Sequence, residues 1–249
     1  MPNNDGIFRL SVIAAKCFFV IVLPFLAVGF GHEVLAVAGR LTLTSSRSVA
    51  FLSGALLFIP VWRVATRYCW RPWQFICTLE HEITHAVAGL PFLFLPRSIR
   101  VTATDGGHVK QVWIGPRFLV PLYGPGSLIS GLAPYFLPLA PYVLIALDLI
   151  FFRTRSSWFG IVLGFVTAFH IITTWAETAY RQPDLREAGI LFSTLFLPVA
   201  NLVGLGGIFA YVTGGSSAFM RFWIDGYLLS LSAVQYFFHW MTGLHVLNH

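Results

Sequence analysis

The run from Trp73 to Leu95 reads WQFICTLEHEITHAVAGLPFLFL and is mostly apolar, with Glu80, His81, Glu82 and His85 near its centre. Its length matches the roughly 20 residues with which an α-helix crosses a bilayer. An ionisable side chain inside such a helix costs roughly 2.5 to 3.5 kcal/mol on insertion scales and usually marks a functional site. We therefore expect residues 73–95 to form a transmembrane helix with a functional site in its middle.

His81, Glu82 and His85 form an HExxH motif. Residues four apart share one face of a helix, so both imidazoles can bind the same cation. Glu82 lies about 100° round the helix from His81, which places its carboxylate beside the metal, where it can accept a proton from water. Two imidazoles and one carboxylate with an open fourth position are typical of catalytic zinc. We therefore predict one Zn²⁺ ion, with Glu82 as the catalytic base.

The composition of the whole chain excludes a soluble globular protein. Of its 249 residues, 57% are hydrophobic and 10% are charged, whereas an ordinary soluble domain has roughly 25% charged residues. The 3 cysteines include no CxxC pair, which argues against a disulfide scaffold and a thiolate metal site. The net charge of +6 is spread over short loops, which disfavours nucleic acid as a partner. The class that remains is a membrane protein embedded in the lipid bilayer.

Further apolar runs predict an all-α polytopic membrane protein with six to eight transmembrane helices. Besides residues 73–95, we expect helices over residues 10–37, 49–66, 158–178, 188–213 and 219–247. As one helix, residues 118–152 would be about 50 Å long at about 1.5 Å per residue. Prolines and glycines interrupt that run, so we expect two pieces there, or one helix and a re-entrant segment.

One segment, Ser98 to Ile114, departs from the helical pattern and reads SIRVTATDGGHVKQVWI. Apolar and polar residues alternate up to the turn at residues 105–107, which predicts a short membrane-associated β-hairpin after the motif helix. An exposed edge strand can pair with an extended peptide, and glycines let that peptide approach closely. The alternative is a hairpin that only packs between helices. The expected substrate-binding residues are Gly106, Gly107, His108 and Val109.

A zinc site of this kind needs a third protein ligand. The acids that follow the motif are Asp105, Asp148, Glu177, Asp184, Glu187 and Asp225. Asp105 sits in the predicted turn, where a turn former is expected anyway. Asp148 and Asp225 lie near predicted helix ends. Glu177 and Asp184 flank a polar break between two apolar helices, so either carboxylate can complete the site.

Four elements resemble the site-2 protease family of intramembrane zinc metallopeptidases. They are HEITHAVAG at residues 81–89, Gly106-Gly107-His108-Val109, Gly124-Pro125-Gly126, and a later Asp near a helix end, and together they cover residues 78–201. The resemblance implies a core of transmembrane helices, zinc ligated by His81 and His85, and Glu82 as general base. It also implies a third ligand from a later helix, and Asp184 fits that role best by order and spacing.

The chain departs from the family pattern at two places. Asp184 stands in Gln182-Pro183-Asp184-Leu185, whereas family members usually have a glycine after the ligand aspartate. The asparagine commonly found beyond the Gly-Pro element is missing, and Ser127 and Ser130 lie nearby instead. Both departures concern residues around the expected zinc site, while the HExxH motif itself is intact.

The motif and the resemblance together predict an intramembrane zinc metalloprotease, with a peptidase core at about residues 73–213 of a single transmembrane domain, residues 1–249. It would hydrolyse a peptide bond within or next to a transmembrane segment of a membrane-anchored or transmembrane protein substrate. One alternative is a prenyl-protease-like HExxH peptidase with Glu177 as third ligand, although Arg181 stands where an aspartate is expected in that type. Another is an inactive scaffold that binds a membrane helix, and the intact motif counts against it.

Basic residues near the ends of the predicted spans indicate the orientation of the chain. Arg9 and Lys16 precede the first span, and Arg63, Arg67 and Arg71 precede the third. Only Arg40 and Arg47 lie between the first two spans. The positive-inside rule then places the N-terminus in the cytoplasm. We expect an integral multi-pass protein of the cell's inner membrane.

Overall fold

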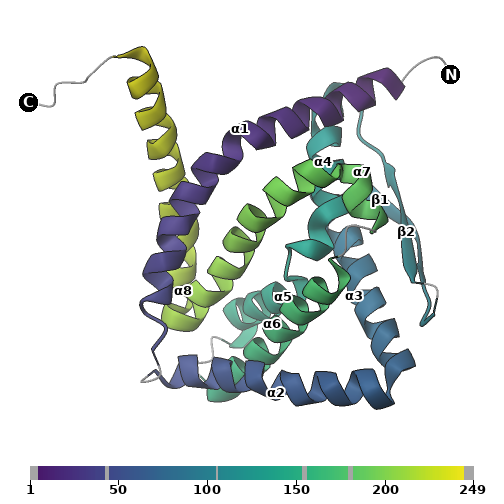
Figure 1. Ribbon diagram of the computed structural model, residues 1–249, viewed down its shortest axis with the longest axis vertical. Helices are drawn as coiled ribbons and strands as arrows, with labels where there is room; N and C mark the ends of the chain where they lie inside the picture. The colour runs from purple at the N-terminus through teal and green to yellow at the C-terminus, as the bar shows by residue number, and fades with distance from the viewer. Residues whose placement is uncertain (1–4, 43–44, 105, 153–155, 179–181, 244–249) are drawn as a thin grey trace, which may run out of the picture.

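The computed structural model describes residues 5–42, 45–104, 106–152, 156–178 and 182–243. These residues are mostly helical and include a two-stranded antiparallel sheet (Figure 1). Short 3₁₀ turns flank α4, and a π-helical turn extends α5. The helices and strands are α1 Asp5–Ala38, α2 Ser46–Tyr68, α3 Trp70–Gly89, β1 Phe94–Val101, β2 Gly107–Trp113, α4 Val120–Leu132, α5 Leu139–Leu147, α6 Ser157–Glu177, α7 Pro183–Ala188 and α8 Ile190–Thr242.

Several helices have the length and apolar character needed to cross a membrane. Within the described residues there are 4, namely Gly6–Ala38, Ser46–Tyr68, Ser157–Glu177 and Ile190–Thr242. A fifth span is possible if Arg117–Tyr135 and Leu139–Phe151 count as one, although these pieces are bent by 92° at the break between them. A mostly helical protein with apolar helices of membrane-spanning length is thus found, but the expected count of six to eight is not confirmed.

The helix that carries the HExxH motif differs from the prediction at its C-terminal end. α3 stops at Gly89, and β1 already begins at Phe94, within the run that was expected to stay helical to residue 95. The chain turns at a 3₁₀ segment that contains Pro91, and then at Leu93, whose φ is 66°. Proline lacks the N–H that a continuing helix needs. The polar centre of α3 also explains why it is not among the helices apolar enough to span a membrane.

The last apolar region, labelled α8, consists of two helical halves that meet at a kink. Helices are expected over residues 188–213 and 219–247, and helical geometry does break between them, at Gly215, where φ is 68° and ψ is −153°. Glycine accepts this positive φ without the steric penalty of a Cβ atom. Figure 1 shows the two halves of α8 folded back at the bend into a V. Residues 244–247, the end of the expected last helix, lie outside the described residues.

Close helix packing holds the bundle together. α1 lies along α8, where the ring of Phe19 contacts that of Phe196 and the ring of Phe30 contacts that of Phe222, each at a centroid distance of 5.4 Å. α2 and α6 approach so closely that a Cβ atom at Gly54 would lie 1.9 Å from the Ile161 carbonyl oxygen. Small residues at such contacts are typical of helix pairs in membranes.

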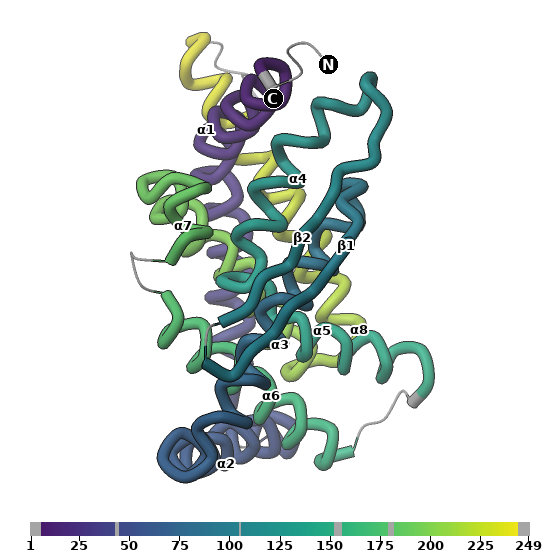
Figure 2. Tube along the Cα trace, turned by 90° about the vertical axis from the view of Figure 1, so that its right-hand side faces the viewer, coloured from purple at the N-terminus to yellow at the C-terminus, as the bar shows by residue number. Residues whose placement is uncertain are grey.

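The predicted β-hairpin is confirmed, with a longer first strand than expected. β1 and β2 pair antiparallel, with Arg100 opposite His108 and an irregularity between Pro96 and Ser98. Asp105, in the expected turn, lies outside the described residues. The hairpin runs beside α3 (Figure 2). At its base, the Trp113 indole N–H donates to the Phe92 carbonyl at 3.1 Å, which ties β2 to the turn after α3.

Candidate metal centre

The three motif residues lie on the inner part of α3, as their helical spacing predicts. Glu82 is 6% exposed and His85 is 7% exposed. The rings of His81 and His85 contact each other edge to face, with 4.9 Å between centroids. The two imidazoles therefore sit together on the buried side of the helix, and Glu82 lies beside them.

Asp184 completes a group of three side chains that could hold a metal ion. Its Oδ2 lies 3.4 Å from His81 Nε2 and 3.5 Å from His85 Nε2. One ligand atom from each of the three residues lies within 4.8 Å of the others. Ligands at about 2.0 to 2.2 Å from a tetrahedral zinc ion lie roughly 3.3 to 3.6 Å from one another. The two distances from Asp184 Oδ2 match this spacing, and imidazole nitrogen and carboxylate oxygen are donors that zinc accepts.

The short helix α7 brings Asp184 to the motif. Pro183 is the first residue of α7. Proline is common at this position because the first turn of a helix does not need the N–H that proline lacks. Asp184 follows in that first turn. Burial by itself would raise the pKa of Asp184, but the hydrogen bonds and charges of His81 and His85 hold it well below its usual range. The contacts with both imidazoles therefore favour the ionised form of the Asp184 carboxylate.

The other ring nitrogen of each histidine is held by an oxygen atom. The Nδ1–H of His81 donates to Glu177 Oε2 at 3.0 Å, and that of His85 donates to the Ser130 carbonyl at 2.7 Å. Hydrogen bonds of this kind fix the tautomer and the ring orientation of metal-binding histidines. Each Nε2 atom is thereby left to face Asp184. Of the two carboxylates that remained open from the sequence, Asp184 joins the candidate group and Glu177 lies at the opposite nitrogen of His81.

Tyr135 is a further residue of the site that the sequence did not identify. Its hydroxyl donates to Asp184 Oδ2 at 3.1 Å, and the residue is 1% exposed. Its ring stands edge-on to the His81 ring at 5.4 Å. Tyr135 lies in a 3₁₀ turn between α4 and α5. Its distance in sequence from both partners follows no motif spacing, so no pattern in the sequence pointed to it.

A cavity of about 1450 Å³ joins this group to the hairpin. Glu82 lines it together with the three residues of the candidate metal group. The expected substrate-binding residues also line it: Gly106, Gly107, His108 and Val109. The approach is closest at Gly107, where a Cβ atom would lie 2.5 Å from Glu82 Oε1 and 2.6 Å from a methyl carbon of Thr78. β2 therefore passes directly against the predicted catalytic base.

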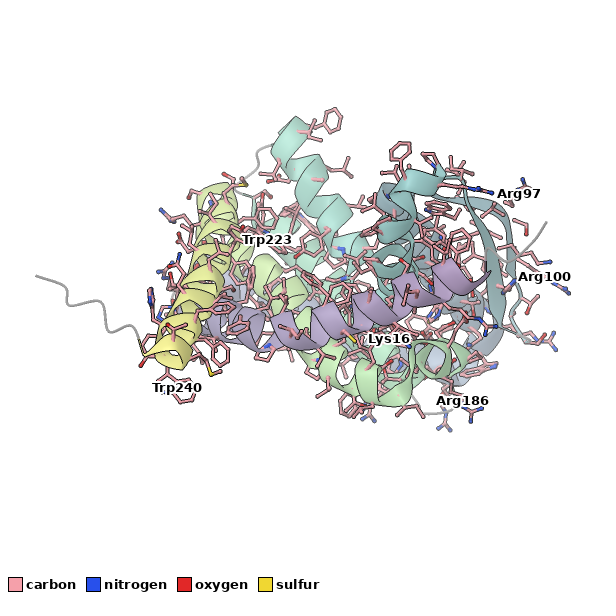
Figure 3. All side chains as sticks on the ribbon, turned by 90° about the horizontal axis from the view of Figure 1, so that it is seen from above. Lys16, Arg97, Arg100, Arg186, Trp223 and Trp240 are labelled. Atoms are coloured by element: carbon pink, nitrogen blue, oxygen red, sulfur yellow. The ribbon has the colours of Figure 1, made fainter. Side chains whose placement is uncertain are left out.

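The outer side of the hairpin, unlike the side that contacts α3, is exposed and carries charged residues. β1 is exposed over most of its length. Figure 3 shows Arg100 extending from the hairpin away from the helices, whereas Arg97 lies at the wall of the cavity. The side of β2 that contacts α3 instead carries glycine and uncharged residues. The strand is thus placed with its uncharged side against the candidate metal helix.

The expected site residues therefore come together, although they derive from α3, the hairpin and α7. The known-protein comparisons add no further evidence for or against this arrangement. No protein-family model, curated protein or solved structure matches the chain, so the resemblance to the site-2 protease family is carried by the quoted motif residues alone.

Proposed function

We propose that the protein is a zinc-dependent intramembrane peptidase of the site-2 protease type. It hydrolyses a peptide bond within or next to a transmembrane segment of a membrane-anchored or transmembrane protein. The observation that carries this proposal is the grouping of His81, His85 and Asp184 in one cavity with Glu82 and the strand β2. The apolar helices support a multi-pass protein, for which we retain the inner membrane and a cytoplasmic N-terminus as part of the proposal.

In the proposed mechanism, His81, His85 and Asp184 would hold zinc, which would supply a Lewis acid and make water more acidic. Glu82 accepts the proton from the attacking water as the water oxygen adds to the carbonyl carbon of the substrate. Glu82 then returns this proton to the amide nitrogen as the carbon–nitrogen bond breaks. Glu177 and the Ser130 carbonyl keep the two imidazoles in place during this cycle.

The hairpin offers a backbone edge on which the substrate can be extended. Within the described residues the sheet has two strands, so β2 has one neighbour and one free edge. The Thr102 N–H donates to the Gly106 carbonyl at 3.0 Å. Hydrogen bonding alternates along an antiparallel pair, so the N–H groups of Gly107 and Val109 point to the free edge. A substrate strand paired there exchanges its helical hydrogen bonds for new ones, which avoids unsatisfied backbone groups in the membrane.

Metal removal tests the proposed function directly. The purified protein is expected to cleave a membrane-anchored reporter polypeptide and to lose this activity when a chelator such as 1,10-phenanthroline removes the metal. Added zinc should restore cleavage, and metal analysis should find about one zinc ion per chain. Reporter fragments are measured on gels and identified by mass spectrometry. Undiminished cleavage by protein shown to contain no metal would contradict the proposal.

Gly107→Ala tests whether Glu82 needs the space that glycine leaves. The added methyl group would lie 2.5 Å from Glu82 Oε1, so the carboxylate or the strand must move. A misplacement of about 1 Å at a reacting group can lower the rate about 100-fold, and we expect a loss of roughly 10- to 100-fold with zinc still bound. Gly31→Ala is the matched control, because a Cβ atom there meets nothing within 4 Å and the residue does not line the cavity. Equal cleavage rates for both variants would show that the contact between β2 and Glu82 does not affect catalysis.

Val109→Pro tests pairing on the free edge. Proline removes the backbone donor that faces this edge, and β1 does not use that donor. We expect cleavage to slow by roughly 3- to 10-fold, the equivalent of about one hydrogen bond, while zinc content stays unchanged. Val109→Ala keeps the N–H and controls for the smaller side chain. If Val109→Pro cleaves at the wild-type rate, the proposed peptidase function stands, but the proposal that substrate binds by pairing with β2 is wrong.

The prenyl-protease-like alternative has less support, because Glu177 hydrogen-bonds the Nδ1 of His81 and lies outside the group that could hold the metal. The inactive scaffold has no observation in its favour. The motif histidines, Glu82 and a third carboxylate are all present in one cavity.

A further inference from the structure

Hydrogen bonds hold both the ring and the backbone carbonyl of His85. The Gln111 side-chain amide donates to the His85 carbonyl at 2.7 Å, and the Ser130 hydroxyl lies 2.9 Å from the same oxygen. Ser130 Oγ also lies 2.8 Å from Gln111 Oε1, so the three residues form one connected cluster. Ser130 comes from α4 and Gln111 from β2. The hairpin strand is therefore joined by hydrogen bonds to a predicted metal ligand.

The end of α3 is shaped to admit the Gln111 side chain. Gly89 lies one turn after His85, and a Cβ atom there would be 2.6 Å from Gln111 Nε2. Any larger residue would displace the amide from the His85 carbonyl. Gln111 and Gly107 are four residues apart in β2, so both lie on the same face of the strand. This face thus contacts Glu82 through Gly107 and His85 through Gln111.

The free edge of β2 is also where the proposed function seats the substrate strand. A strand that pairs with this edge would restrain the backbone of β2. The hydrogen bond from the Gln111 amide to the His85 carbonyl would then also restrain His85. We propose that Gln111 is a positioning residue that couples substrate pairing on β2 to the orientation of the metal ligand His85. This inference rests on the proposed peptidase function. It adds that the substrate itself helps to order the metal centre.

Gln111→Met tests the coupling, because methionine has a similar length but donates no hydrogen bond. We expect kcat for the reporter to fall about 10- to 100-fold, which is typical when a partner of a metal ligand is lost. KM should change by less than about 3-fold, because the backbone edge of β2 remains available for pairing. Gln235→Met, at an exposed position of α8, is the matched control and should keep the wild-type kcat.

A spectroscopic measurement separates positioning from a general loss of structure. The protein is loaded with Co²⁺, and the visible spectrum is recorded with and without the uncleaved reporter in a Glu82→Gln background. The reporter should alter the spectrum when Gln111 is present and leave it unchanged in the Gln111→Met variant. Ser130→Ala removes the second side-chain contact to the His85 carbonyl, that of the Ser130 hydroxyl, and should also weaken the spectral response. Thermal unfolding of each variant identifies any that fail to fold.

The outcomes distinguish this inference from the proposed function. If Gln111→Met and Ser130→Ala both keep the wild-type kcat and spectral response while metal removal still abolishes cleavage, the coupling is wrong and the peptidase stands. A rise in KM with an unchanged kcat would also overturn it, because Gln111 would then only bind substrate. If the wild-type protein neither binds Co²⁺ nor cleaves the reporter, the inference falls together with the proposed function.

Discussion

Glu82→Gln is expected to lower reporter cleavage by about 10²- to 10⁴-fold while zinc remains bound. Glutamine keeps the size of the side chain but cannot accept the proton from water. Glu82 is 6% exposed and lines the cavity beside the candidate metal group without belonging to it. Metal content by elemental analysis and initial cleavage rates, measured on the same preparation, test both halves of this expectation.

Two kinds of variant define the role of Glu82 further. His81→Ala and His85→Ala should lose zinc as well as activity, because each removes a predicted ligand. Glu80→Gln is the matched control, since the Glu80 carboxylate faces Thr84 Oγ1 at 3.5 Å and His170 Nδ1 at 3.9 Å instead of the cavity. Equal zinc loss in Glu82→Gln and the histidine variants would make Glu82 a ligand. Cleavage at the wild-type rate in Glu82→Gln would refute the mechanism.

Asp184→Ala is expected to lower zinc affinity more than Glu177→Ala does. Asp184 faces the Nε2 atoms of both histidines, whereas Glu177 only receives a hydrogen bond from His81 Nδ1. Loss of a residue that orients a ligand typically weakens metal binding by about 10- to 100-fold, and loss of the ligand itself should exceed this. Zinc occupancy after equilibration in zinc-buffered solutions measures the difference.

Asp225→Ala in α8 serves as the acidic control for this comparison and should retain zinc. The reverse order, with Glu177→Ala the more damaging, would favour the prenyl-protease-like arrangement. An experimentally mapped zinc ion with neither carboxylate within about 2.0 to 2.2 Å would exclude both as ligands.

Several features of this protein follow from local sequence patterns. The HExxH spacing puts His81 and His85 on one helix face because an α-helix repeats every 3.6 residues or so. The alternation after residue 98 and the glycines at its turn predicted the hairpin, since side chains of a strand alternate between faces. Such patterns depend on the geometry of neighbouring residues alone. They did not predict where α3 ends, because single residues can redirect an apolar run without changing its composition. The break at Gly215 does fall between the two expected helices, over residues 188–213 and 219–247.

The choice between the two candidate carboxylates depended on packing between distant segments. Asp184 is 103 residues from His81 in the chain, and Glu177 is 96 residues from it. No local sequence pattern shows which of these two distant residues lies nearer the metal group. The family resemblance only favoured Asp184 over Glu177 as the third ligand. Their different positions arise because α6 ends at Glu177 and α7 begins at Pro183, on opposite sides of the His81 ring.

The sequence by itself determined the motif, its helix, the hairpin and the apolar character of the chain, because each of these depends on residues that are close in the chain. Only the tertiary structure decided that Asp184 faces both Nε2 atoms, that Gly107 leaves room for Glu82, and that Gln111 reaches the His85 carbonyl. These contacts join α3 to α7 and to β2. They depend on how whole elements pack against one another, and side-chain packing of this kind is not encoded in any short stretch of residues.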